Sequence, residues 1–176
     1  MKRTLLRLIA AMLLFGAFSA AFARPVRDYL TEEEIDAIQR NQKIDPRVKL
    51  YLKAASSRLI AAEARLAGQE TEPGDPLEYF TPEDMLDAYY HILNSVMLNL
   101  EDAVEKFPPD RGGIRKALKH LESVMKKNIP RLEKLERMAA AKEETELVGL
   151  ILRAIDISNG ALEGAEEALE GKFSEY

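Results

Sequence analysis

The stretch "TPEDMLDAYYHILNSVMLNLEDAVEKF", Thr81 to Phe107, decides the fold of this chain. The hydroxyl of Thr81 can cap a helix, and Pro82 suits the first helical position because the N–H that it lacks would have no partner there. After this start, apolar residues recur every three or four positions, which is the period of one helix face. The members of this face are Leu86, Tyr90, Leu93, Met97, Leu100, Val104 and Phe107. The pattern predicts a long helix with one side buried in a core.

Similar start signals predict two more helices, and helical patterns after the turn "PPDRGG" (108–113) and from about Thr145 predict another two, while signals for strands are nearly absent. Thr31 is followed by Glu34, which completes the S/T-x-x-E capping box of a short helix. Asp45-Pro46 repeats the pattern of a cap followed by proline and predicts a second start. The long helices are expected at about 46–67, 82–107, 111–141 and 145–169. These helices, joined by short to moderate loops, predict an all-α fold, an antiparallel bundle of four long helices plus a short N-terminal helix.

Charge alternates along the four long helices. Residues 46–67 carry five basic residues and one acidic residue, and residues 111–137 carry nine basic and three acidic. Residues 82–107 carry six acidic and one basic, and residues 143–176 carry nine acidic and two basic. In an up-down-up-down bundle, this alternation would set opposite charges across every seam between sequence neighbours. Glu63 is expected to pair with a basic residue of 111–137, and that basic helix has an alternative use as a binding surface for phosphate or anionic lipid headgroups.

The N-terminus has the three parts of a secretory signal peptide. Lys2, Arg3 and Arg7 precede an apolar stretch at 8–18, and Ala21-Phe22-Ala23 supplies a small-x-small cleavage site. We therefore expect a signal peptide at 1–23 and a single helical-bundle domain at 24–176, with an uncleaved anchor as the alternative. The expected location is the bacterial periplasm or the medium.

Composition excludes several classes of function. The chain has no cysteine, which excludes zinc–thiolate sites, thiol catalysis, lipid attachment through cysteine and covalent c-type haem. Without the three basic residues of the signal peptide, 22 basic residues remain against 30 acidic ones, a formal net charge of −8. This charge argues against a general nucleic-acid binder.

Few residues are candidates for chemistry. On a helical wheel, His91 lies about 160° from Leu93, so we expect it to face away from the core, next to Asp87 at the i,i−4 position. Asp87 and His91 provide two metal ligands at most, and His120 lies among lysines, which disfavour both a metal and a protonated imidazole. A haem-b site that uses Met85 or Met125 with His120 is the remaining cofactor option. With no G-x-S-x-G, H-E-x-x-H or phosphate-binding loop, we predict no catalytic, cofactor-binding or metal-binding residue and no enzymatic activity.

The segments "DYLTEEEIDAIQRNQKIDPRVKLYLKAASSRL" (28–59) and "ALEGAEEALE" (161–170) resemble an uncharacterised family of small exported bacterial helical proteins. The resemblance implies export and an all-helical fold, and it transfers no site residue. The resulting hypothesis is an exported, soluble bundle that acts by binding or scaffolding with an unknown protein partner in the cell envelope. The alternatives are a weak metal- or haem-binding periplasmic bundle and a peripheral membrane protein that uses the basic helix at 111–137.

Overall fold

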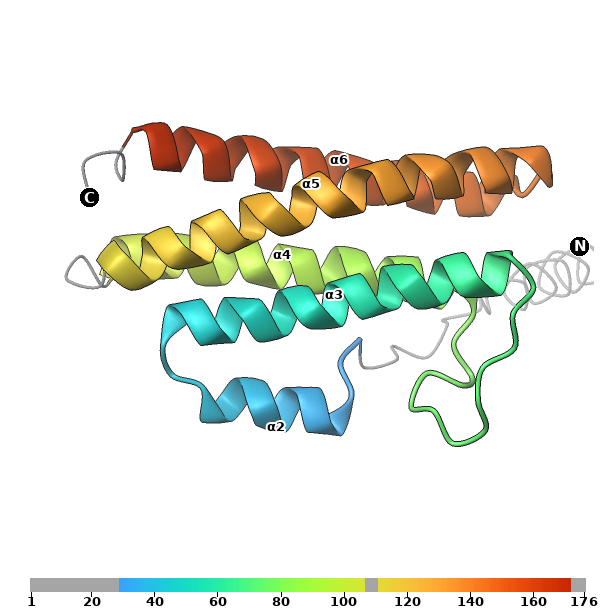
Figure 1. Ribbon diagram of the computed structural model, residues 1–176, viewed down its shortest axis with the longest axis horizontal. Helices are drawn as coiled ribbons and strands as arrows, with labels where there is room; N and C mark the ends of the chain where they lie inside the picture. The colour runs from blue at the N-terminus through green and yellow to red at the C-terminus, as the bar shows by residue number, and fades with distance from the viewer. Residues whose placement is uncertain (1–28, 107–110, 172–176) are drawn as a thin grey trace, which may run out of the picture.

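The computed structural model describes residues 29–106 and 111–171, and within these ranges it contains helices and no strand. The elements are α2 (Glu32–Arg40), α3 (Ile44–Leu66), α4 (Pro82–Lys106), α5 (Arg111–Ala141) and α6 (Thr145–Glu170). The all-α bundle of four long helices with a short N-terminal helix is confirmed (Figure 1). The expected signal peptide, the cleavage after Ala23 and the apolar position Phe107 lie outside the described residues.

The predicted helix starts are correct in two of three cases. Thr31 and Glu34 form the capping box of α2, and the Thr81 hydroxyl accepts a hydrogen bond from the Asp84 backbone N–H at the start of α4. The expected cap at Asp45 is wrong, because α3 already begins at Ile44 and its N-cap is Lys43. Pro46 is compatible with this earlier start, since none of the first four N–H groups of a helix has an intrahelical partner.

The four long helices form a ring in the order α4, α3, α5, α6. Consecutive helices α3 and α4 pack tightly, as do α5 and α6, while α4 and α5 meet only marginally. The other two close pairs are α3 with α5 and α4 with α6; Figure 1 shows α3 and α5 side by side, with α4 behind them. The expectation that every sequence neighbour would be a spatial neighbour is therefore wrong for α4 and α5.

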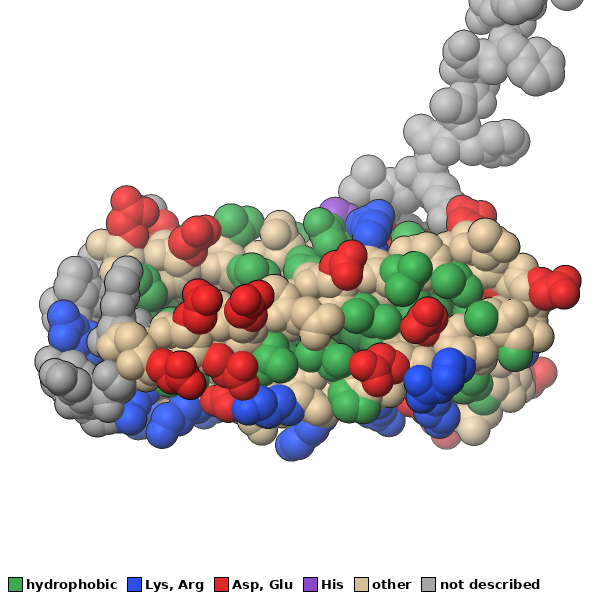
Figure 2. Space-filling view, turned by 90° about the horizontal axis from the view of Figure 1, so that it is seen from above, with side chains coloured by type: hydrophobic (Ala, Val, Ile, Leu, Met, Phe, Trp, Pro, Cys, Tyr) green, Lys and Arg blue, Asp and Glu red, His purple; other side chains and the backbone are tan. Residues whose placement is uncertain are grey.

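This ring places helices of like charge side by side. We call α3 and α5, which are both rich in Lys and Arg, the basic pair, and α4 and α6, which are both rich in Asp and Glu, the acidic pair. In Figure 2, acidic side chains are scattered over the face, whereas most of the Lys and Arg side chains line its lower edge. Apolar burial explains why charge does not choose the neighbours: a buried aliphatic side chain contributes about 1.5–3 kcal/mol, whereas an exposed ion pair contributes about 0–1 kcal/mol.

The buried side of α4 is turned relative to the predicted face. Tyr89 is completely buried, whereas the predicted core residues Tyr90, Met97 and Val104 are only half-buried. The reason is that α4 is covered from two sides, by α3 and by α6, so its core arc is broad and centred nearer Tyr89. In α6, small residues make up most of the buried side, namely Ala154, Ser158, Ala161 and Ala165, whereas Ile155 and Leu162 are only half-buried.

Candidate functional site

The seam between α4 and α6 is closed over its N-terminal half. The Arg153 guanidinium lies 4.4 Å from the centre of the Tyr90 ring, and its Nη2 is 3.6 Å from Asp87 Oδ1. Beneath this cover, the Tyr89 hydroxyl lies 2.8 Å from Ser158 Oγ, so that a hydrogen bond joins α4 to α6 inside the core. Burial raises the pKa of Tyr89 above its ordinary value. One cation and one buried hydrogen bond thus hold the two acidic helices together here.

The same seam opens into a groove over its C-terminal half. The groove has a volume of about 540 Å³, which lies within the ~300–1,000 Å³ range of ligand pockets. We call it the α4·α6 groove. Its α4 wall consists of Met97, Leu100, Glu101, Val104 and Glu105; its α6 wall of Gly160, Ala161, Gly164, Ala165 and Ala168; and its floor of Leu118 and Leu121 from α5.

Two glycines, which have no side chain, form part of the α6 wall of the groove. Gly160 and Gly164 are exposed, and, apart from adjacent residues and the nearby backbone of α6, no heavy atom of the described chain lies within 4 Å of the position that a Cβ would take at either residue. Glycine in the middle of a helix costs about 0.5–1 kcal/mol relative to alanine. The helix nevertheless continues from Thr145 to Glu170 through both of them. Open space, and not a close neighbour, therefore surrounds these two positions.

The rim of the groove is acidic and has no internal counter-ion. Glu101 and Glu105 are exposed on the α4 wall, and Glu167 is exposed on α6, on the same side of the helix as Gly160. Within 29–106 and 111–171, none of these three carboxylates has a hydrogen-bond or ion-pair partner. Beside Glu101, Leu98 is 56% exposed. An apolar floor with an unpaired acidic rim can bind a ligand that is apolar on one side and cationic on the other.

The seam of the basic pair is bridged along its length. Glu63 of α3 accepts from Lys134 Nζ at 2.7 Å and lies 3.3 Å from Arg131 Nε, as its sequence position predicted. The hydrogen bond from Lys134 lowers the pKa of Glu63 below its ordinary value, and Arg131 lowers it further against the opposing effect of burial. Asn128 also donates to Ser56 Oγ at 3.3 Å. An ion pair and a hydrogen bond thus join α3 to α5.

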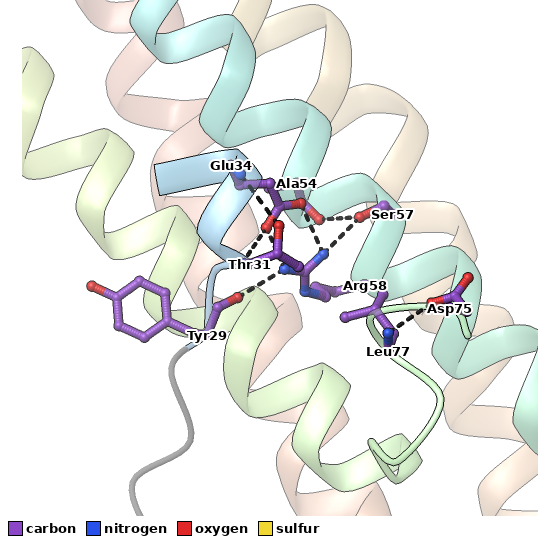
Figure 3. A network of polar contacts seen from close by, with 8 residues as sticks. All are labelled: Tyr29, Thr31, Glu34, Ala54, Ser57, Arg58, Asp75 and Leu77. Carbon is purple, nitrogen blue, oxygen red and sulfur yellow. Dashed lines mark hydrogen bonds and ion pairs between the residues drawn. The ribbon is translucent and has the colours of Figure 1, made fainter. Parts of the chain in front are cut away.

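A buried arginine attaches α2 to α3. Arg58 is 1% exposed, and its guanidinium donates to both carboxylate oxygens of Glu34 (3.0 and 2.5 Å) and to the Tyr29 carbonyl at 3.0 Å. Figure 3 shows these contacts converging on Arg58, with Ser57 beside it. A cavity of about 620 Å³ adjoins this cluster, between α2, α3 and the segment at 75–77. Because the Arg58–Glu34 ion pair already uses both charges, this cluster is a structural clamp for α2.

The structure places His91 on the surface, as predicted. Its Nε2 lies 3.5 Å from Asp87 Oδ2, and its ring stacks on Tyr29 with the ring centres 5.7 Å apart. Asp87 is shared with Arg153, so a cation already occupies the vicinity of the only predicted ligand pair. Across 29–106 and 111–171, no three His, Cys, Asp or Glu side chains are arranged to hold a metal ion.

The remaining cofactor candidates belong to different environments. Met85 and Met125 are completely buried in the apolar core. His120 is half-buried near Lys49, Asp45 and Lys127. Burial lowers the pKa of His120, and Lys49 lowers it further, which agrees with the predicted effect of its cationic surroundings.

Sequence reasoning missed the α4·α6 groove. The available signal was the spacing of Gly160, Gly164 and Ala168, which places three small residues on one side of α6 at i, i+4 and i+8. The structure adds the second requirement, which is that α4 lies beside this face and leaves it partly uncovered. No helix among the described residues is long and apolar enough to span a membrane.

Comparisons with known proteins give no relative: no family model, no curated protein and no solved structure matches this chain.

Proposed function

We propose that this chain is an exported, non-catalytic binding protein of the cell envelope that holds a segment of another protein in the α4·α6 groove. The observation that carries the proposal is the groove itself, an apolar trough of about 540 Å³ along the seam between α4 and α6. Its wall contains apolar side chains, glycines and carboxylates, and no His, Ser, Thr or Lys that would act as nucleophile or base with them. Such a surface suits binding and not turnover.

Export is the second part of the proposal. It is supported by the positive start of the chain, the apolar stretch at 8–18 and Ala21-Phe22-Ala23. We expect the mature chain to begin at Arg24 and to lie in the periplasm or the medium. Sequencing the N-terminus of protein from the producing cell tests this part, and an intact Met1 on the folded protein would contradict it.

Crosslinking in the producing cell tests the groove. A photo-reactive phenylalanine derivative replaces Gly164 in the groove or, as the matched control, Gly149. Both glycines are exposed in α6, and both have open space at the Cβ position. We expect a discrete crosslinked product from position 164 only, and we expect it to disappear when Gly160→Leu fills the groove. Equal products from both positions, or none from either, would contradict the proposal.

Contact of the basic pair with anionic lipid is a second candidate. It is supported by exposed lysines of α5 that have no ion-pair partner among the described residues, namely Lys116, Lys119 and Lys127. Juxtaposed basic residues contribute about 1 kcal/mol each at an anionic membrane surface. Sedimentation with phosphatidylglycerol liposomes at low and high salt tests this candidate. Binding is expected to weaken at high salt. It is also expected to weaken in Lys116→Gln/Lys119→Gln and not in Lys43→Gln.

A further inference from the structure

We infer that the segment held in the α4·α6 groove is a cationic amphipathic helix. This inference rests on the proposed binding role of the groove and names the chemical class of its partner. Two independent features support it: the dimensions and small residues of the groove, and the unpaired carboxylates along its rim.

The dimensions of the groove suit a short helical contact. Its walls extend from Met97 to Glu105 on α4 and from Gly160 to Ala168 on α6. Each wall spans eight residue steps, which is about 12 Å at 1.5 Å per residue, or two helical turns. A helix presents apolar side chains at i, i+3, i+4 and i+7 over this length, which is the usual pattern of a helix in a groove. Glycine and alanine on one wall let the backbone of such a helix approach closely.

The charges around the groove specify the other side of that helix. Glu101 and Glu105 lie on the α4 wall. On α6, Glu167 is at i+3 from Gly164 and at i+7 from Gly160, so it lies on the same side of the helix as these glycines. All three carboxylates are exposed and without a partner in the described part of the chain. A bound helix with Lys or Arg flanking its apolar stripe would meet them from both sides.

Arg153 shows within the chain how a cation can lie between the two acidic helices. In the closed half of the seam, its guanidinium covers Tyr90 and approaches Asp87, and it is the cation that lies between the two acidic helices there. In the open half, no described cation takes the corresponding position over Glu101 and Glu105. We infer that the partner supplies that cation from outside.

A second copy of the chain fits the groove less well. Its most basic helix is α5, but the apolar side of α5 is buried within its own bundle. A second copy would therefore present lysines without the apolar stripe that the groove floor requires. Self-association remains a measurable outcome and is included in the test.

The experiment uses the chain from Arg24 to Tyr176 and fluorescein-labelled 18-residue probe peptides, with fluorescence anisotropy at low salt. The cationic probe has Leu at i, i+3, i+4 and i+7 and Lys elsewhere; the neutral probe has Gln in place of every Lys. We expect the cationic probe to bind at least fivefold more tightly than the neutral one, and this ratio to shrink at high salt because screening weakens exposed charge pairs. Gly164→Leu is expected to weaken both probes at least tenfold, and Gly149→Leu to change neither by more than twofold.

Charge variants isolate the role of the rim. Glu101→Gln/Glu105→Gln is expected to lower the affinity for the cationic probe to that for the neutral probe. The matched control Glu33→Gln/Glu133→Gln changes the net charge equally at exposed sites outside the groove and is expected to leave the ratio unchanged. Circular dichroism melts verify that each variant is folded, and Gly160→Leu serves as a second way to fill the groove.

The outcomes separate the inference from the proposed function. If both probes bind equally and both respond to Gly164→Leu, the cationic class is wrong and the groove still binds helices. If no probe responds to Gly164→Leu or Gly160→Leu, both the inference and the proposed function are wrong. If sedimentation detects a dimer that Gly164→Leu abolishes, the occupant is a second copy and the inference is overturned.

Discussion

The basic pair and the acidic pair differ in how far counter-charges within the chain offset the repulsion between their two helices. Each pair places two helices of like charge side by side. In the basic pair, Glu63 lies between Arg131 and Lys134, and Asn128 reaches Ser56. In the acidic pair, the one bridging cation among the described residues, Arg153, lies in the N-terminal half of the seam. The C-terminal half has neither a counter-ion among the described residues nor a covering side chain, and the groove lies there.

This difference shows where the molecule has charge left for a partner. Three acidic side chains on the basic side are used internally: Glu63 by Lys134, Asp45 by Lys49 and Glu122 by Lys126. On the acidic side, Glu101, Glu105 and Glu167 have no partner among the described residues. A surface with unpaired charge around an uncovered apolar floor is the one from which an intermolecular contact gains most.

The largest loss in the free energy of unfolding is expected from a substitution at the clamp between α2 and α3. Glu34→Gln keeps the capping box, because glutamine can serve at the same position. It removes the charge that faces buried Arg58, and an unpaired buried charge typically costs about 3–5 kcal/mol. We expect urea unfolding to give a loss of about 3 kcal/mol, against less than about 1 kcal/mol for exposed Glu33→Gln. Equal losses in the two variants would mean that the clamp does not stabilise the basic side.

A direct comparison of the two seams is expected to give the next largest effect. Glu63→Lys places a third cation between Arg131 and Lys134 and should cost about 2 kcal/mol, more than one exposed pair is worth. Arg153→Glu should cost about 1 kcal/mol or less, since the Arg153 side chain is 51% exposed and the Glu63 side chain 19%. Denaturant melts at low salt measure both free energies of unfolding. The reverse order would remove the contrast between the seams.

Substitution of the groove glycines should have a small effect of opposite sign. Gly164→Ala adds a methyl group into open space and removes the helical penalty of glycine, so we expect a gain of about 0.5–1 kcal/mol in the free energy of unfolding. Gly149→Ala is the matched control and should gain as much. A loss at position 164 alone, measured by thermal unfolding, would show that α4 approaches α6 more closely than the open groove implies.

The smallest change in the free energy of unfolding is expected from substitution of His120, which lies in the seam of the basic pair. Because burial lowers the pKa of His120, the unfolded chain binds a proton more readily than the folded one. The contribution of neutral His120 to the free energy of unfolding is therefore fully present above pH ~6.5, the ordinary pKa of histidine. It is lost as the pH drops through the lowered pKa. His120→Gln should remove this part of the pH dependence when unfolding is compared at pH 7.5 and 5.5. A variant that keeps the whole slope of the wild type would exclude His120 as its source.

Much of the fold follows from local signals. The starts of α4, α5 and α6 agree with the predicted helices, and the capping box at Thr31 and Glu34 is present. These features depend on neighbours within one turn, which the sequence contains directly. The partner of Glu63 was also predictable, because a lone acid at the edge of a basic helix needs a cation wherever that helix packs.

The lateral order of the helices and the groove were not predictable in the same way. The alternating charges suggested that α4 and α5 are neighbours, but exposed ion pairs are too weak to select neighbours against the burial of core side chains. The choice between Tyr89 and Tyr90 depends on which helices cover α4, and this is a property of the assembled bundle. The groove depends on the same lateral order, so Gly160 and Gly164 could not be recognised as its wall from the sequence alone.

The buried hydrogen bond between Tyr89 and Ser158 has an optical consequence. The chain contains no tryptophan, so its near-ultraviolet spectrum comes mainly from six tyrosines. Because burial raises the pKa of Tyr89, its phenol resists ionisation in alkali for as long as α4 and α6 stay in register. A slip of either helix by one turn would separate the two hydroxyls and change the surroundings of the phenol. The tyrosinate absorbance of Tyr89 is therefore a built-in reporter of helix register, readable without any label.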